Sequence, residues 1–213
     1  MGKRLGRICM ITGAVLIVAA LSLVLWNQNE DKKSGESARD ILSQLIVQIP
    51  TTEAAQDDLF PEAEIPENDL FEEYQQESET QPVEVLLEVD GEMYLGVVEI
   101  PALGLELPVM SDWSYPNLKK APCRFKGSQL TDDLILIAHN YNSHFGNISS
   151  LQTGDIVRIT DCAGAVSDYE IVQIEEVGGY DIEQMESGDW DLTLFTCTYS
   201  GTSRVTVRCV RCE

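Results

Sequence analysis

The chain contains a run of 19 residues without a charge, at positions 8–26, and this run constrains the protein more than any other feature. A helix of that length rises roughly 30 Å, which suits the hydrocarbon core of a bilayer. Trp26 ends the run where an interfacial aromatic ring would lie, and three basic residues within positions 1–7 precede it. The positive-inside bias predicts a cytoplasmic segment at 1–7, a transmembrane helix at 8–26 and an extracellular remainder.

A cleaved secretory signal is the alternative interpretation of residues 8–26. The apolar core is long for such a signal, and no clear small-x-small cleavage site follows it. We therefore expect an uncleaved signal anchor and a single-pass protein at the cell membrane.

Residues 27–82 form a strongly acidic segment, with fifteen Asp or Glu and three Lys or Arg. After Ile49 this segment holds too few apolar residues to offset the entropy of ordering the chain, and like charges should extend it. We expect a largely disordered acidic stalk, with the spacing of a short amphipathic helix at 39–49. An acidic motif that docks a partner is the alternative role for this segment.

The whole chain carries 14 basic and 36 acidic residues, a net charge of -22. Nucleic-acid binding needs clustered Lys and Arg, so no nucleic acid is expected as a partner. The six cysteines include no pair of C-x-x-C motifs, and Cys209 and Cys212 would point to opposite faces of one strand. We expect no metal or cofactor, and whether Cys123, Cys162, Cys209 and Cys212 form disulfides stays open.

Residues 83–213 show short strand-like runs at roughly even spacing, with few helix signals. Asp90 and Gly91 separate the first two runs and give a strong hairpin signal, and a helical turn is expected near 116–122. This pattern predicts a mainly β domain, a compact barrel or sandwich. The expected strands are 83–89, 93–100, 103–110, 134–140, 156–161, 166–177, 191–197 and 204–210.

Three residues at the ends of these expected strands could carry chemistry: His139, Cys197 and Arg204. A nearby imidazolium or guanidinium favours a thiolate, and the histidine can then protonate a leaving amine. An arginine can also stabilise a developing oxyanion. Yet a cysteine at a strand end is more often a small buried residue, so the residue types alone leave both interpretations open.

A resemblance to the sortase family extends over about residues 92–211. The sequence "TLFTC" at 193–197, followed by an arginine that opens "RVTVR", resembles the sortase signature. The run "LILIAHN" at 134–140 is similar to the strand that delivers the family's histidine, and "YLGVVEIPALGLELPV" at 94–109 is similar to an early sortase segment. The resemblance implies a closed β-barrel of about eight strands with short helices, preceded by the membrane helix and the stalk.

The resemblance also implies a function, a cysteine transpeptidase that cleaves a C-terminal sorting signal of secreted proteins. It makes Cys197 the nucleophile of a thioacyl intermediate, His139 the general acid and base, and Arg204 the group that binds substrate or stabilises the oxyanion. Thr196 matches the motif threonine that commonly lines the substrate groove. The amine that resolves the intermediate would belong to a peptidoglycan precursor or to another surface protein.

The sequence departs from the family pattern at a few positions. Ala138 stands where many sortases have glycine, and only six residues separate Cys197 from Arg204. Arg208 and Arg211 are therefore rivals of Arg204, and His144 is the rival of His139.

Subclass and activity leave alternatives open. No N-terminal lid motif is found and the chain ends directly after its last strand, which favours cell-wall anchoring over pilus assembly. A non-catalytic β-rich surface-binding module and a cysteine peptidase that uses only water are the alternative functions.

Overall fold

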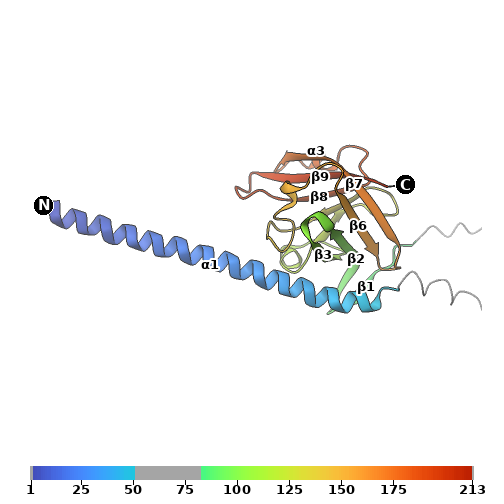
Figure 1. The fold of residues 1–213 in the computed structure, drawn as a ribbon, viewed down its shortest axis with the longest axis horizontal. Coiled ribbons are helices and arrows are strands. Elements are labelled where there is room, and N and C mark those ends of the chain that lie inside the picture. The colour runs from blue at the N-terminus through green and yellow to red at the C-terminus, as the bar shows by residue number, and fades with distance from the viewer. Residues whose placement is uncertain (1, 51–82, 213) are drawn as a thin grey trace, which may run out of the picture.

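The computed structural model describes residues 2–50 and 83–212, with side chains from residue 10 onward (Figure 1). The strands in these ranges are β1 (Leu87–Val89), β2 (Glu92–Ile100), β3 (Leu105–Met110), β4 (Cys123–Lys126), β5 (Leu134–Ile137), β6 (Ile156–Asp161), β7 (Val166–Gly178), β8 (Leu192–Cys197) and β9 (Ser203–Arg211). The helices are α1 (Gly2–Gln48), α2 (Tyr115–Leu118) and α3 (Ile182–Glu186), with single 3-10 turns η1 (Pro101–Leu103) and η2 (Ile148–Ser150).

Eight strands form a closed ring in the order β2-β3-β4-β5-β8-β9-β7-β6, because β2 pairs with β3 on one side and with β6 on the other. β1 pairs with β2 outside this ring, as the first arm of a hairpin. Neighbouring strands are antiparallel except β3 with β4 and β5 with β8. The expected closed barrel of about eight strands is confirmed.

The hairpin expected at Asp90 and Gly91 joins β1 to β2. Both residues have positive φ, 52° for Asp90 and 79° for Gly91, as a two-residue type I′ turn requires. A further glycine, Gly96, has φ 152° at a register shift in β2, and a Cβ there would lie 2.1 Å from the Thr160 carbonyl oxygen. Only glycine therefore permits the close contact of β2 with β6 that closes the barrel.

Alternate residues of the strands fill the inside of the barrel. Leu134 and Leu136 of β5, Leu192 and Leu194 of β8, and Val207 of β9 are fully buried in one apolar cluster. The strand period of two then directs the intervening residues of these three strands to the outer surface. This outer face of β5, β8 and β9 carries the candidate site.

The long helix α1 continues beyond the apolar run and lies along the barrel (Figure 1). Its part from Met10 onward is long and apolar enough to cross a membrane. On the C-terminal part, Ser34, Ala38, Ile41 and Leu45 form a stripe with helical spacing, and all four are buried. The helix packs against β1 and β3, so it covers a patch of the barrel's outer surface.

The structure corrects the expectation of a disordered stalk that begins at residue 27. Residues 27–48 are helical, and the helical spacing noted at 39–49 is the part of that expectation that is confirmed. The acidic composition led to the wrong expectation for residues 27–48. Their charges lie mainly on the outer face of the helix, and a few apolar residues are enough to dock the helix on the barrel. The rest of the expected stalk, 51–82, lies outside the described residues.

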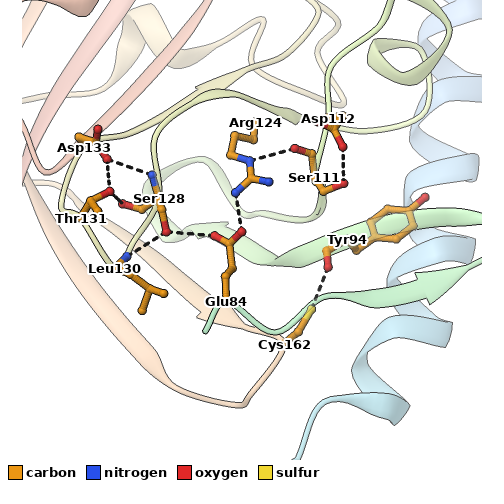
Figure 2. A network of polar contacts seen from close by, with 10 residues as sticks. All are labelled: Glu84, Tyr94, Ser111, Asp112, Arg124, Ser128, Leu130, Thr131, Asp133 and Cys162. Atoms are coloured by element: carbon orange, nitrogen blue, oxygen red, sulfur yellow. Dashed lines mark hydrogen bonds and ion pairs between the residues drawn. The ribbon is translucent and has the colours of Figure 1, made fainter. Parts of the chain in front are cut away.

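A polar network fixes the start of the folded domain near residue 83 (Figure 2). Arg124 of β4 donates to the Glu84 carboxylate at 2.5 Å and to the Ser111 carbonyl oxygen at 2.9 Å. Ser128 donates to the other Glu84 oxygen at 3.1 Å. This half-buried carboxylate therefore ties the entering chain to β4 and to the loop that follows β4, and Arg124 extends the network to the loop after β3.

Candidate active site

The pairing of β8 with β9 brings two of the predicted site residues together. Cys197, the last residue of β8, is the direct partner of Arg204 in the antiparallel register. Directly opposed residues point to the same face of a sheet, so the thiol and the guanidinium share the outer face of the barrel. The tight turn between them contains Gly201 at φ 73°, and the short connection noted in the sequence is what puts these residues in register.

His139 reaches the same end of the barrel from the neighbouring strand. β5 runs parallel to β8, with Ile137 beside Phe195, and the Ala138 amide donates to the Phe195 carbonyl oxygen at 3.2 Å. The strand ends at Ile137, so His139 begins the following loop instead of ending the strand. The sequence pattern predicted the histidine at this rim and extended the strand, expected at 134–140, three residues too far.

The three residues line one groove of about 280 Å³ on the outer face of the barrel. Its apolar lining comes from β4, β5 and β8, from α3, and from the segment that leads into α2. Such a mainly apolar groove with a few polar groups at one end is typical of a ligand-binding site. The apolar lining residues are Trp113, Tyr115, Leu118, Phe125, Ile137, Ala138, Ile182, Met185 and Phe195.

Aromatic rings form one wall of this groove. Phe125 packs edge-on against Phe195 with ring centroids 5.3 Å apart, and Trp113 lies 6.1 Å from both Phe125 and Tyr115. Offset and edge-to-face geometries are those that aromatic pairs prefer. Because Trp113 and Tyr115 remain partly exposed, this wall can cover an apolar side chain that enters the groove.

His139 lies half-buried at the polar end of the groove. Burial lowers the pKa of His139, and the positive charge of Lys119 lowers it further. The ring packs 4.8 Å from the Tyr141 ring, and it makes no hydrogen bond within the described residues. A neutral imidazole next to the groove can accept a thiol proton and return it to a leaving group.

Arg204 is held by the turn that precedes it. Its Nη1 donates to the carbonyl oxygens of Gly201 at 3.2 Å and Ser203 at 3.0 Å. A Cβ at Gly179 would lie 3.3 Å from the same nitrogen, so the β7–β8 connection closes over the guanidinium. This packing restricts the side chain to the groove end.

The rival arginines do not line the groove. Arg208 is 1 % exposed and donates to Glu175, to Thr193 and to the carbonyl oxygens of Gln184 and Met185. These bonds fix α3, which forms a groove wall. Arg211 lies elsewhere and pairs with Asp132. Arg204 is therefore the arginine that the structure brings to His139 and Cys197.

Thr196 is not among the residues that line the groove. Its side chain is 2 % exposed and points to the opposite face from Cys197, where the hydroxyl donates to the Ala138 carbonyl oxygen at 2.8 Å. The expectation that this threonine lines the groove is therefore wrong in this structure. Its bond joins β8 to the residue before His139, so it holds the strand that carries Cys197 against the end of β5 that leads to His139.

The other described cysteines differ from Cys197 in their surroundings. Burial raises the pKa of Cys123 and of Cys209 to about 12, so these thiols are inert near neutral pH. All five cysteines between residues 83 and 212 are free thiols, and Cys212 is exposed just after the end of β9. The described residues contain no group of three or more side chains that could hold a metal ion.

His144, the rival of His139, lies away from the groove and is fully buried under α1. Its Nε2 is 3.0 Å from the Ser34 hydroxyl. Burial lowers the pKa of His144 to about 4, so this ring is neutral under ordinary conditions. Its position identifies it as a structural residue of the loop.

Sequence reasoning missed the groove residues outside the motif strands. Trp113 and Tyr115 lie in a segment expected to be mostly loop, and Ile182 and Met185 lie on α3, a helix that was not expected. Loop and short-helix residues carry no periodic signal, so only the local density of aromatic residues near Trp113 could have indicated the wall.

Comparisons with known proteins identify the family of the folded domain. A family model described as the sortase domain matches residues 98–212. Sortase A from Bacillus anthracis is 29 % identical over 115 residues, which cover 51 % of this chain and 54 % of the relative. The chain thus spans about half the length of the curated relative that it matches.

Solved structures give the same result. Clostridium perfringens sortase C, crystallised with the C-terminal cell wall sorting motif, is 30 % identical with a TM-score of 0.50, over 56 % of this chain and 71 % of that one. Sortase C from Streptococcus pneumoniae is 26 % identical with a TM-score of 0.51, over 60 % and 69 % of the two chains. Sortase A from Corynebacterium diphtheriae, at 21 % identity and a TM-score of 0.53, covers 57 % of this chain and 62 % of its own and supports the fold alone. Because the sortase model matches more than half of its residues, the chain belongs to the sortase family.

Proposed function

We propose that this protein is a membrane-anchored cysteine transpeptidase that cleaves a C-terminal sorting signal and transfers the acyl group to an amine. The observation that carries this proposal is the convergence of Cys197, His139 and Arg204 on one apolar groove. A nucleophile, a proton carrier and an oxyanion-stabilising cation are the three parts that thioacyl chemistry needs. Membership of the sortase family supports the same reaction class.

In the first half of the proposed reaction, the Cys197 sulfur attacks the scissile carbonyl carbon and its proton passes to His139. The new C–S bond leaves negative charge on the carbonyl oxygen, and the Arg204 guanidinium stabilises this charge. The C–N bond then breaks as His139 protonates the leaving amine. The product is a thioester on Cys197.

In the second half, an amine enters the groove and attacks the thioester carbonyl. His139 accepts a proton from this amine, the C–S bond breaks, and the Cys197 thiolate recovers a proton. The released product carries a new amide bond. We assign the acceptor to a peptidoglycan precursor or another surface protein, because both offer primary amines outside the cell.

The apolar wall of the groove supports a peptide with apolar side chains before the scissile bond. Trp113, Phe125 and Phe195 offer ring faces and edges that such side chains would cover. A secreted protein with a C-terminal sorting signal is the substrate class we propose. The similar Clostridium perfringens sortase C was solved with the motif of such a signal.

The N-terminal helix gives the proposed location. The apolar part of α1 is exposed from Met10 to Trp26 and could cross a membrane. Basic residues at positions 3, 4 and 7 favour a cytoplasmic N-terminus, which places the barrel outside the cell.

The proposal is tested with the full chain in detergent micelles and a library of C-terminal sorting-signal peptides. We expect cleavage of a subset of peptides, faster product release with added hydroxylamine, and loss of both activities in Cys197→Ala. The exposed Cys212 offers the matched control, and Cys212→Ala should retain both activities.

Two other outcomes would contradict the proposal. Cleavage that added amines do not accelerate would indicate a peptidase that uses only water. Peptide binding without cleavage, together with a Cys197 thiol that no electrophile labels near neutral pH, would indicate a binding module.

A further inference from the structure

The helix that carries the apolar run also contacts the loop that follows His139. Asp31 lies on α1 shortly after Trp26. Its carboxylate accepts hydrogen bonds from the backbone amides and the side chains of Asn142 and Ser143, at 2.6 to 3.3 Å. Burial acts to raise the pKa of Asp31, but these hydrogen bonds outweigh it and lower the pKa. The ionised carboxylate thus caps the loop tip.

A second contact lies one helical turn further along α1. The Ser34 hydroxyl donates to the Lys119 carbonyl oxygen at 2.6 Å, so it must accept the proton of His144 Nε2 at 3.0 Å. Ser34 and His144 are both buried. One serine therefore joins α1, the segment after α2 and the histidine loop.

The fit between α1 and this loop is close. A Cβ at Gly35 would lie 2.9 Å from the Ser143 Cβ, so a larger residue would push the loop away from the helix. Asp31, Ser34 and Gly35 thus contact the loop or its neighbouring segment from adjacent positions on α1, through hydrogen bonds and close packing.

Ring packing and backbone hydrogen bonds within the loop link this contact to His139. Tyr141 lies between the two histidines, with ring centroids 4.8 Å from His139 and 5.8 Å from His144. The His144 amide donates to the Tyr141 carbonyl oxygen, and the Phe145 amide donates to that of His139. The His139 ring makes no hydrogen bond of its own within the described residues, so its orientation depends on this packing.

We infer that Asp31 and Ser34 are positioning residues for His139, so that the membrane-anchoring helix is a working part of the active site. The inference rests on the proposed function for the role of His139. Neither Asp31 nor Ser34 lines the groove, so both act through the loop at 140–145. Asp31 lies about 8 Å along the helix from Trp26, so tethering and catalytic geometry share one rigid element.

The test compares four variants of the full chain in micelles: Asp31→Ala, Asp31→Asn, Ser34→Ala and the control Asp40→Ala. Asp40 is an exposed acid on the same helix, and its replacement changes the net charge equally. We expect Asp31→Ala to lower kcat about 10- to 100-fold with KM for the peptide unchanged, because displacing a proton carrier slows chemistry without removing groove contacts. Asp31→Asn keeps one acceptor oxygen and should recover part of kcat.

A spectroscopic readout separates positioning from loss of fold. The chain has only two histidines, so labelled imidazole carbons give two signals, and His139→Gln assigns them. In Asp31→Ala the His139 signal should move, and its titration midpoint should rise toward the ordinary histidine value as water reaches the ring. In Asp40→Ala both signals should stay unchanged.

The outcomes are distinguishable. One outcome is turnover by the wild type, with kcat and the His139 signal unaltered in Asp31→Ala and in Ser34→Ala. This outcome would overturn the inference and leave the proposed function intact. A kcat loss equal to the loss of folded protein, measured by labelling of Cys197, would also overturn it. Absence of wild-type turnover would contradict the proposed function, and the His139 signal would still show whether α1 controls the ring.

Discussion

Two histidines five positions apart occupy opposite sides of one loop. His139 faces the groove, half-buried, and no hydrogen bond fixes its ring within the described residues. His144 faces α1, is fully buried and pairs with Ser34. Burial lowers the pKa of both rings, to about 4 for His144. The same residue type therefore lines the groove on one side, where we propose that it carries protons, and makes a structural contact on the other.

The surroundings of each histidine ring determine what that ring can do. A groove that water and substrate can enter leaves His139 free to exchange protons, whereas a dry helix contact keeps His144 neutral. The two sides are also mechanically joined, because one short loop with internal backbone bonds carries both rings. Substitutions on each side of the loop therefore have different expected effects.

The largest effect is expected when each of the two histidines is replaced in turn. His139→Gln should lower kcat/KM about 1000-fold with little change in the free energy of unfolding, because it removes the acid and base. His144→Ala should lower the free energy of unfolding by about 2 kcal/mol and spare more of the activity, because it leaves a cavity under α1. Steady-state kinetics and urea titration measure both. Equal activity losses in the two variants would show that the two histidines do not have different roles.

The two arginines on the same face of β9 give the next contrast. Arg204→Ala should lower kcat/KM about 100-fold and change stability by less than about 0.5 kcal/mol, because the groove loses its cation. Arg208→Ala should cost about 3 kcal/mol of stability, because it leaves Glu175 and two backbone carbonyls of the α3 region without their donor. Thermal unfolding of each variant checks the ranking, and an unfolded Arg204→Ala would refute it.

Acid should weaken the fold through His144. Its folded pKa of about 4 lies below the ordinary value near 6.5, so the unfolded chain binds the proton first as pH falls. The stability that neutral His144 contributes is complete above pH 6.5 and is lost as pH falls toward 4. This group should cost roughly 2 kcal/mol between pH 7 and pH 5.

The matched variant is His144→Asn, which cannot titrate in this range. Its free energy of unfolding, from urea titrations at pH 7 and pH 5, should change by less than that of the wild type. The same pH dependence in both proteins would exclude His144 as its source. Asp31 does not contribute in this window, because its lowered pKa places its titration below pH 4.

The smallest effect concerns the charge beside the groove. Lys119→Met should raise the pKa of His139, because it removes a nearby positive charge and keeps the backbone carbonyl that Ser34 binds. A titration of the His139 imidazole signal measures this change. A midpoint that stays in place or falls would show that burial alone sets this pKa.

The sequence was sufficient to predict the closed barrel and three residues that line one groove on its outer face. Strand periodicity, the hairpin at Asp90 and Gly91, and the placement of His139, Cys197 and Arg204 all depend on local pattern and on strand ends. Apart from the helical spacing at 39–49, the docked part of α1 was not predicted, because its few buried residues lie in a segment whose composition is typical of disorder. The contact exists only once the barrel offers a surface.

The face of the sheet to which a side chain points was harder to predict than the strand that carries it. Thr196 precedes Cys197, and a strand period of two sends it to the other face, into a bond with Ala138. The choice between Arg204 and Arg208 required knowing that α3 covers Arg208. Short helices and loops that complete a groove are fixed by tertiary contacts, which a single sequence does not display.

The most direct test is the mass of the full chain after brief mixing with an intact sorting-signal peptide that the protein cleaves. We predict an adduct at Cys197 with the mass of the acyl part of the peptide. Hydroxylamine should remove this adduct, and the adduct should accumulate more slowly in the His139→Gln variant. An adduct at another residue, or full turnover by a Cys197→Ala variant, would contradict the account.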